Sequence, residues 1–265
     1  NNAQSDALYA LPTAFDYIRL GHPLSCVFEW FVADLNNCNA DRVISFSSTT
    51  TPILAILRKN LLDKRETRII YTDSMPACFD AEVLKSVYGY KFELQKVNDI
   101  NEISKFNGST VFITNYDDSA VVKSFSNVDF TVAIVSNYGS VIVVHGDHNE
   151  QYISEIQHVR RRESIAMTPA NTLVVLNKMV AKSFQTPDKN NRETDKKFVL
   201  NELSKITGAE TNAVVGSSGL SIQYAILMGL IHHAQEKHPG KAIKIVVPPN
   251  CYGGTNDQAR RIAAC

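Results

Sequence analysis

The stretch that decides the fold is Val214-Val-Gly-Ser-Ser-Gly-Leu-Ser-Ile-Gln-Tyr-Ala-Ile-Leu227. A variant of it occurs earlier, as Val43-Ile-Ser-Phe-Ser-Ser-Thr-Thr-Thr-Pro-Ile-Leu-Ala-Ile-Leu57. Each copy has an apolar strand, a Ser-Ser turn and the start of an apolar helix that carries Ala-Ile-Leu at the same place. A second apolar strand is expected after each helix. Strands that alternate with helices are typical of a parallel sheet with helices on its faces, so the sequence predicts an α/β fold with an internal duplication.

The same alternation extends along most of the chain. Strands are expected at residues 43–46, 68–71, 110–114, 130–136 and 140–144. Helices are expected at 52–62, 77–87 and 150–162, and over 25–35 with Ser25 as the N-cap. A polar segment at 184–194 is predicted to be a linker. The expected order after it is helix 198–206, strand 213–215, helix 221–234, strand 242–247 and a new helix from 255.

This order predicts two units in the chain. Residues 1–180 are expected to form a complete unit, and residues 181–265 the beginning of a second, related unit. The last expected helix is still in progress at Cys265, where no α/β sheet would be complete. The sequence is therefore interpreted as a fragment of a longer protein.

Bulk properties exclude several classes of function. The 265 residues have a formal net charge of zero, which offers no electrostatic footprint for nucleic acid or for an anionic membrane. No run of about 18 apolar residues predicts a membrane span, and the polar start at residues 1–6 does not resemble a signal peptide. Five cysteines without a Cys-x-x-Cys pair favour free thiols, and hence a cytoplasmic protein.

The Ser-Ser-Gly turn of the later stretch is a candidate phosphate site. A turn between a strand and a helix exposes backbone N–H groups, and the helix dipole at that end favours an anion. Gly219 is expected to allow a close approach to a ligand and a positive φ, whereas Thr49 in the earlier stretch resists that conformation. A purely structural turn is the alternative, because short motifs of this kind are not specific.

A second candidate feature follows the last expected strand, in Tyr252-Gly-Gly-Thr255. Ligands of open α/β sheets bind beyond the carboxyl ends of strands. A tyrosine followed by two glycines at such an end can lay its ring over a planar heterocycle. A turn that is merely capped by the tyrosine is the alternative interpretation.

Together these features resemble the Cys/Met-metabolism family of pyridoxal-phosphate enzymes, such as cystathionine γ-synthase, cystathionine lyases and methionine γ-lyase. In that family a Ser-Ser-Gly-(Met) turn binds the cofactor phosphate, and the tyrosine of a Tyr-Gly-Gly-Thr motif stacks on the pyridine ring. The resemblance implies that Ser217, Ser218, Gly219 and Leu220 bind the phosphate of pyridoxal 5′-phosphate, and that Tyr252 is the stacking and catalytic residue. It also implies a three-layer αβα fold with a mainly parallel sheet, like the large domain of aspartate-aminotransferase-type enzymes.

The family also carries an N-terminal Tyr-x-Arg-x-Gly-Asn-Pro-Thr motif, and this chain has Tyr17-Ile-Arg-Leu-Gly-His-Pro23. In the family this tyrosine and arginine reach across a dimer to the cofactor phosphate of the neighbouring subunit. The resemblance therefore implies that Tyr17 and Arg19 bind the cofactor. The earlier copy keeps these two residues, and the later copy keeps the glycine turn and Tyr252. We therefore expect either a pseudo-dimer within one chain or a homo-oligomer.

The chain departs from the family at the Schiff-base lysine. The Ser-x-x-Lys-Tyr motif that holds this lysine has no match, and the nearest piece, residues 136–139, contains no lysine. The earlier copy is therefore interpreted as a degenerate unit, and the segment by itself as inactive.

The function implied is part of a pyridoxal-phosphate-dependent enzyme of transsulfuration. Such an enzyme eliminates or replaces a group at Cβ or Cγ of a small amino acid substrate. The alternatives are a catalytically inactive structural or dimerisation domain, and a binder of another phosphate ligand at Gly219.

Two further clusters are given a structural interpretation, and no metal site is expected. The segment His145-Gly-Asp-His148 lacks a third ligand nearby, so it is interpreted as a polar turn rather than a metal site. The run Arg160-Arg-Arg162 is interpreted as a solvated helix end whose charge matches the helix dipole.

Overall fold

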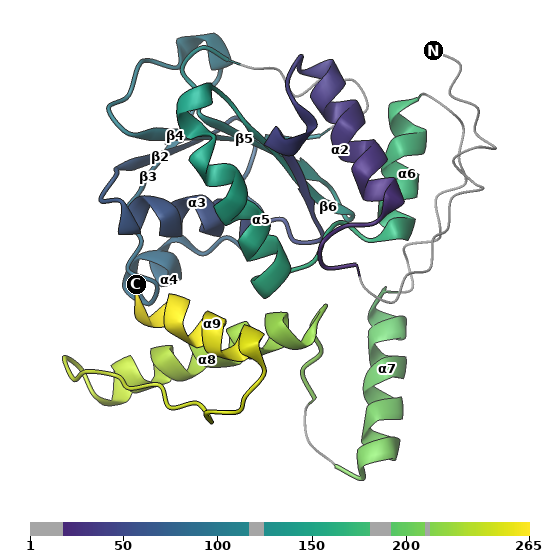
Figure 1. The fold of residues 1–265 in the computed structure, drawn as a ribbon, viewed down its shortest axis with the longest axis vertical. Coiled ribbons are helices and arrows are strands. Elements are labelled where there is room, and N and C mark those ends of the chain that lie inside the picture. The colour runs from purple at the N-terminus through teal and green to yellow at the C-terminus, as the bar shows by residue number, and fades with distance from the viewer. Residues whose placement is uncertain (1–17, 117–124, 181–191, 210–212) are drawn as a thin grey trace.

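The computed structural model describes residues 18–116, 125–180, 192–209 and 213–265, and within them a six-stranded sheet (Figure 1). The strands are β1 (Val43–Phe46), β2 (Thr67–Tyr71), β3 (Glu93–Lys96), β4 (Ser109–Asn115), β5 (Phe130–Val135) and β6 (Gly139–Val144). Their order across the sheet is β1-β6-β5-β4-β2-β3. Neighbours among β3, β2, β4 and β5 pair in parallel, whereas β6 is antiparallel to both β5 and β1. The prediction of an α/β fold with a mainly parallel sheet is confirmed.

Three strands form where the sequence is apolar on both faces. Every residue of β1, β5 and β6 is buried, as expected for strands with helices on both sides of the sheet. β3 was not predicted, because it is an edge strand whose four residues, Glu-Leu-Gln-Lys, are all exposed. Polar side chains on an edge strand discourage pairing with other chains, but they also remove the apolar signal from the sequence.

Helices cover both faces of the sheet and complete three layers (Figure 1). One face packs against α3 (Thr51–Leu62), α4 (Ala81–Ser86) and α5 (Gln151–Glu163). The other packs against α2 (Pro23–Leu35) and α6 (Pro169–Met179). Successive residues of one strand therefore enter different cores: Ile44 packs with α3 and α5, and Val43 with α2 and α6.

Three helix starts differ from the sequence predictions. The N-cap of α2 is His22 rather than Ser25, and these two residues cap each other reciprocally, with Ser25 at the third helical position. His22 Nε2 also lies 2.7 Å from the carbonyl oxygen of Met167, and burial lowers the pKa of His22. The expected helix over 77–87 is shorter, with Asp80 as its cap. α6 was not predicted, although Thr168 and Pro169 are a good helix start.

The C-terminal part consists of the helices α7 (Arg192–Thr207), α8 (Gly219–Lys237) and α9 (Gly253–Ala263), joined by irregular segments. Strands predicted at 213–215 and 242–247 are wrong, since neither segment pairs with a described strand. Val214 and Val246 are 76% and 92% exposed. A run of β-formers becomes a strand only when its N–H and C=O groups find a partner strand.

Two other expectations concern the ends of helices in this part. Of the predicted linker at 184–194, residues 184–191 lie outside the described residues, and 192–194 belong to α7. α9 ends at Ala263 instead of continuing to the last residue. None of the helices in the described ranges is long and apolar enough to cross a membrane.

A buried ion pair fixes the segment before α2 to the rest of the fold. The side chain of Arg160 on α5 donates to Glu29 Oε1 at 2.6 Å and to the carbonyl oxygen of Leu20 at 2.8 Å. Glu29 also accepts from the amide and the hydroxyl of Ser45 on β1. The interpretation of residues 160–162 as a solvated helix end is therefore wrong for Arg160, which is only 7% exposed.

Replacing Arg160 with leucine should lower the free energy of unfolding by about 3–5 kcal/mol, because the carboxylate of Glu29 would stay buried without its cation. The matched control is Arg161→Leu, which removes the same charge from an exposed neighbour on the same helix. It should change stability by about 0.5 kcal/mol or less. Urea denaturation measures both, and equal losses in the two variants would contradict the structural role of the pair.

Candidate functional site

The N-terminus of α8 presents free backbone donors at the predicted phosphate turn. Ser218 is the N-cap, and its hydroxyl accepts from the amide of Ser221 at 3.1 Å, while its own amide donates to the hydroxyl of Ser221 at 2.9 Å. No described group accepts from the amides of Gly219 and Leu220. These are the first two positions of the helix, where an anion finds unpaired N–H groups and a favourable dipole.

Gly219 does not have the positive φ expected from the sequence. A Cβ atom built at Gly219 would meet nothing within 4 Å, so the backbone there borders open space. Backbone strain in the turn therefore does not require a glycine at position 219. The feature that remains is the pair of amides at Gly219 and Leu220, from which no described group accepts.

The turn at Ser47 and Ser48, which aligns in the sequence with Ser217 and Ser218, is closed by its own serine. The hydroxyl of Ser48 accepts from the amides of Thr50 and Thr51, at 3.3 and 3.1 Å. α3 begins at Thr51, three residues after this serine, whereas α8 begins directly after Ser218. The amides of Thr50 and Thr51 thus have an acceptor, whereas those of Gly219 and Leu220 have none among the described residues. The difference between the turns lies in these hydrogen bonds and not in backbone strain at Thr49.

The N-terminus of α9 lies against that of α8. Tyr252 is the N-cap of α9 and makes no side-chain capping hydrogen bond. A Cβ atom built at Gly254 would lie 2.5 Å from the Tyr252 ring, 2.9 Å from Leu220 Cδ1 and 3.0 Å from Arg162 Nη1. A larger residue there would displace these side chains, so Gly254 allows the tyrosine, the start of α8 and an arginine of α5 to converge as they do.

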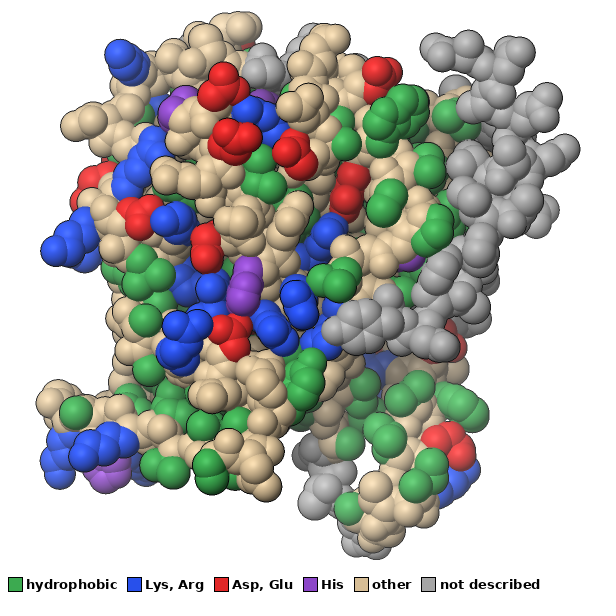
Figure 2. Space-filling view, viewed as in Figure 1, with side chains coloured by type: hydrophobic (Ala, Val, Ile, Leu, Met, Phe, Trp, Pro, Cys, Tyr) green, Lys and Arg blue, Asp and Glu red, His purple; other side chains and the backbone are tan. Residues whose placement is uncertain are grey.

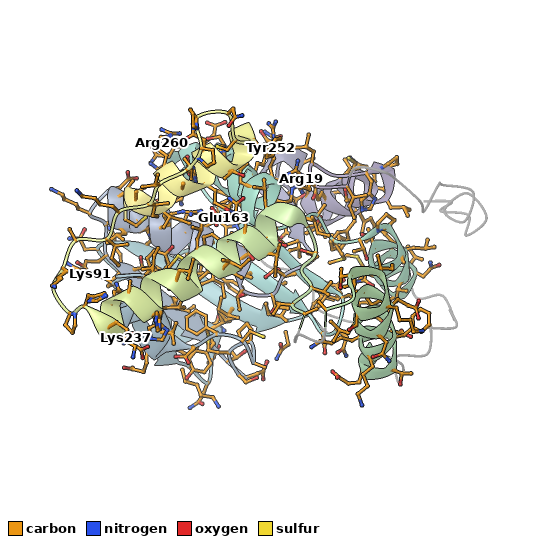
Figure 3. All side chains as sticks on the ribbon, turned by 90° about the horizontal axis from the view of Figure 1, so that it is seen from below. Arg19, Lys91, Glu163, Lys237, Tyr252 and Arg260 are labelled. Atoms are coloured by element: carbon orange, nitrogen blue, oxygen red, sulfur yellow. The ribbon has the colours of Figure 1, made fainter. Side chains whose placement is uncertain are left out.

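The structure brings Arg19 to Tyr252. The guanidinium of Arg19 donates to the hydroxyl of Tyr252 at 3.2 Å, although the two residues are 233 positions apart (Figure 3). A longer contact of 3.5 Å joins Arg19 to the carbonyl oxygen of Arg161. The adjacent carbonyl of Leu20 is held by Arg160, which fixes the backbone from which Arg19 extends. Tyr17, the other predicted residue of this arm, lies outside the described residues.

The positive charges around Tyr252 favour the negatively charged form of its hydroxyl. A hydrogen bond from Arg19, supported by its charge and by Arg162, lowers the pKa of Tyr252 from its ordinary value. The tyrosine is 59% exposed, so its hydroxyl is accessible to a ligand. Figure 2 shows lysine and arginine side chains gathered on the face where α5 meets α9. Described basic residues of these helices include His158, Arg162, Arg260 and Arg261.

Arg162 is the residue of this cluster that sequence reasoning missed. Its Nε is buried without a hydrogen-bond acceptor among the described residues and lies 3.5 Å from Asp257 Oδ2 on α9. The buried amide of Gln258 donates to the carbonyl oxygens of both Arg162 and Leu220, which holds α5 and α8 together. The run of three arginines is visible in the sequence. Which of the three faces the site depends on its position around the helix, and the composition does not reveal that.

The residues of the 145–148 segment have separate partners. His145 Nε2 lies 2.8 Å from the hydroxyl of Thr131, and burial lowers the pKa of His145 to about 4. Asp147 accepts from Arg42 at 2.6 Å, and His148 pairs with Asp129 at 3.0 Å. Within the described ranges, no group of three potential metal ligands converges.

Comparison with known proteins gives distant similarities only. No protein-family model matches the chain, and no curated protein sequence matches it. A Listeria monocytogenes structure provisionally named L-allo-threonine aldolase is 13% identical, with a TM-score of 0.43 over 77% of this chain and 70% of that one. L-threonine-O-3-phosphate decarboxylase from Porphyromonas gingivalis is 10% identical, with a TM-score of 0.37 over 77% and 74%. Cystathionine gamma-lyase from Lactobacillus plantarum, complexed with L-serine, is 13% identical, with a TM-score of 0.39 over 64% and 57%. Similarities at this level identify neither the family nor the activity of the chain.

Removing the guanidinium in Arg19→Ala should raise the pKa of Tyr252 toward the ordinary tyrosine value of about 10. The phenolate would then form at higher pH, because its main hydrogen-bond donor is lost. Spectrophotometric titration measures this, with the signal of Tyr252 isolated by subtracting the titration of the same protein carrying Tyr252→Phe. Arg42→Ala, which removes an arginine paired with Asp147, is the control and should leave the pKa unchanged. An unchanged pKa in Arg19→Ala would show that another group stabilises the phenolate.

Proposed function

We propose that the chain binds pyridoxal 5′-phosphate, as part of an enzyme that acts on sulfur amino acids. The observation that carries this proposal is the 3.2 Å hydrogen bond between Arg19 and Tyr252, beside the free amides of α8. Arg19 belongs to the earlier copy, and Tyr252 and the turn belong to the later one. Their contact supports a pseudo-dimer within one chain, in which the arm of one copy reaches the turn of the other.

The residues present fit the phosphate end of the cofactor. The amides of Gly219 and Leu220 offer two backbone donors that have no described acceptor. The planar guanidinium of Arg19 suits a phosphate, because it presents several donors in one plane. Arg162 adds positive charge beside Tyr252, partly balanced by Asp257, whose Oδ2 lies 3.5 Å from Arg162 Nε. These groups would bind and orient the phosphate.

Tyr252 is the residue that would act nearest to the chemistry. When bound, pyridoxal phosphate supplies an electron sink for breaking bonds next to the α-carbon of an amino acid. With its lowered pKa and its exposed hydroxyl, Tyr252 can hold or release a proton at Oη at lower pH than an ordinary tyrosine. Its ring would lie against the cofactor, and Arg19 would keep the hydroxyl in place.

The more specific proposal is cleavage or replacement at Cβ or Cγ of a sulfur amino acid, and it rests on the sequence motifs. The lysine that binds the cofactor in such enzymes has no counterpart at a matching position of this chain, so we expect binding without turnover from these 265 residues alone. A binder of another phosphate ligand is the second candidate. It is favoured because backbone amides and guanidinium groups suit a phosphate group, whatever is attached to it.

Binding of 4′-deoxypyridoxine 5′-phosphate tests the proposal, because this analogue lacks the aldehyde and does not react with surface lysines. Arg19→Ala should weaken its binding about 10- to 100-fold, as expected for losing a charge-assisted hydrogen bond of about 1.5–3 kcal/mol. Arg42→Ala should bind like the unmodified chain. Isothermal titration calorimetry or equilibrium dialysis measures these affinities.

Two comparisons separate the candidate functions. If inorganic phosphate competes fully while 4′-deoxypyridoxine, without the phosphate, contributes no affinity of its own, the site is for another phosphate ligand. If Arg19→Ala binds the analogue as tightly as the unmodified chain, the site is not the one described here.

A further inference from the structure

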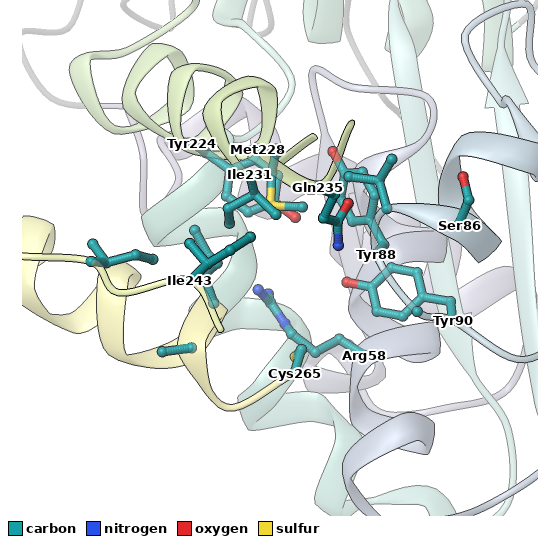
Figure 4. Close-up of a pocket in the computed structure, with 15 residues that line it drawn as sticks. Arg58, Ser86, Tyr88, Tyr90, Tyr224, Met228, Ile231, Gln235, Ile243 and Cys265 are labelled. Atoms are coloured by element: carbon teal, nitrogen blue, oxygen red, sulfur yellow. The ribbon is translucent and has the colours of Figure 1, made fainter. Parts of the chain in front are cut away.

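A cavity of about 280 Å³ lies between the C-terminal part and the first unit (residues 18–180). Its walls come from α8, the end of α9, the 243–245 segment and the 86–90 segment after α4 (Figure 4). This volume is near the lower end for small-molecule sites, at about 300 Å³. None of the residues of the proposed phosphate site lines it, so the cavity is a separate place on the same helix α8.

The floor of the cavity carries a buried charge, some of whose donors have no acceptor among the described residues. Arg58 on α3 is 3% exposed, and its only hydrogen bond to a described residue runs from Nη2 to Glu163 Oε1, at 2.6 Å. Burial opposes the charge of Arg58, but the nearby carboxylate of Glu163 raises its pKa above the ordinary value. Figure 4 shows the guanidinium extending into the cavity, with the hydroxyl of Tyr90 directed toward it. The cavity therefore offers hydrogen-bond donors whose positive charge Glu163 already balances.

The walls are aromatic and apolar. The rings of Tyr88 and Tyr90 are 5.5 Å apart and tilted by 46°, and the rings of Tyr88 and Tyr224 are 6.4 Å apart. Met228 of α8 lines the same space, and its thioether packs favourably against aromatic rings. A flat aromatic body packs well against such a cluster of rings in offset or edge-to-face contact.

We propose that this cavity binds a small, uncharged aromatic molecule bearing a carbonyl group, such as an aryl amide. The carbonyl oxygen accepts from Arg58, and the ring packs among the tyrosines. A carboxylate is disfavoured, because it would bring a second negative charge into a buried space that already holds Glu163. An ammonium group is disfavoured, because it would lie beside the guanidinium of Arg58.

Three probes with the same ring test this chemistry: benzamide, benzoate and benzylamine. Titration by ligand-observed NMR against the full chain should show saturable binding of benzamide, with at least about tenfold weaker binding of the two charged probes. Adding 4′-deoxypyridoxine 5′-phosphate should not displace benzamide, which keeps this result independent of the proposed function. No saturable binding of benzamide, or equal binding of benzoate, would overturn the proposal.

The position is tested by filling the cavity rather than by removing Arg58, because removing the cation would leave Glu163 buried alone. Ala263→Trp places a large ring in the space, since Ala263 is exposed and lines it. Ala264→Trp is the matched control, because Ala264 is the exposed neighbour outside the lining. Ala263→Trp should weaken benzamide binding at least about tenfold, and Ala264→Trp by less than about twofold. Equal effects of the two variants, or no effect of either, would place the ligand elsewhere and reject the assignment.

Discussion

The ion pair of Arg160 with Glu29 is the interaction on which the candidate site depends. It joins α5 to α2 and, through the carboxylate of Glu29, to the amide of Ser45 on β1. The same guanidinium holds the carbonyl oxygen of Leu20, next to Arg19. An exposed arginine arm would lose much side-chain and backbone entropy on binding a ligand. Because the backbone beside Arg19 is already held, less of that entropy remains to be lost.

The end of α5 distributes its consecutive side chains among three environments. Successive helical residues are rotated by about 100°, so neighbours in the sequence face different partners. Arg160 points into the first unit, Arg162 lies at the start of α9, and Glu163 pairs with Arg58 under the cavity. One turn of helix thus anchors the arm of Arg19, adds charge to the candidate phosphate site and balances the buried cation of the cavity. α5 is therefore connected to both candidate ligand sites, through Arg162 at one and through the ion pair of Glu163 with Arg58 at the other.

The sequence predicted those strands whose formation depends on their own apolar residues. It did not predict which segments would pair with another strand. The buried strands β1, β5 and β6 were predicted within a residue or so, because burial on both faces leaves a continuous apolar run. The segments at 213–215 and 242–247 have the same composition, but they have no described strand to pair with, and pairing is not encoded within a segment. The edge strand β3 was missed for the opposite reason, since it pairs with β2 but carries polar, exposed side chains.

For the candidate site too, the sequence predicted the local motifs but not the contacts between residues far apart in the chain. The Ser-Ser-Gly turn and Tyr252 stand out as local motifs, but the approach of Arg162 depends on the docking of α9, where Gly254 leaves room beside it. The sequence predicted a positive φ at Gly219, which the residue does not have. The absence of atoms within 4 Å of its Cβ position was not predictable from the sequence. Contacts between residues far apart require the whole fold, which a motif does not contain.

The docking of α8 and α9 on α5 also determines what a ligand can do to the protein. Much of this interface is polar: His158 pairs with Asp257 at 2.7 Å, and Arg261 pairs with Glu155 at 2.8 Å. Apolar residues on the outer face of α8, such as Ile226 and Leu230, are 55% and 60% exposed and add nothing to it. Polar interfaces within one chain resemble transient ones, for which relative motion is the default.

A ligand held jointly by Arg19 and the amides of α8 binds only the docked arrangement, so its binding free energy must add to the stability of docking. Both candidate sites lie across this same interface, and the two would therefore favour the same arrangement of the chain.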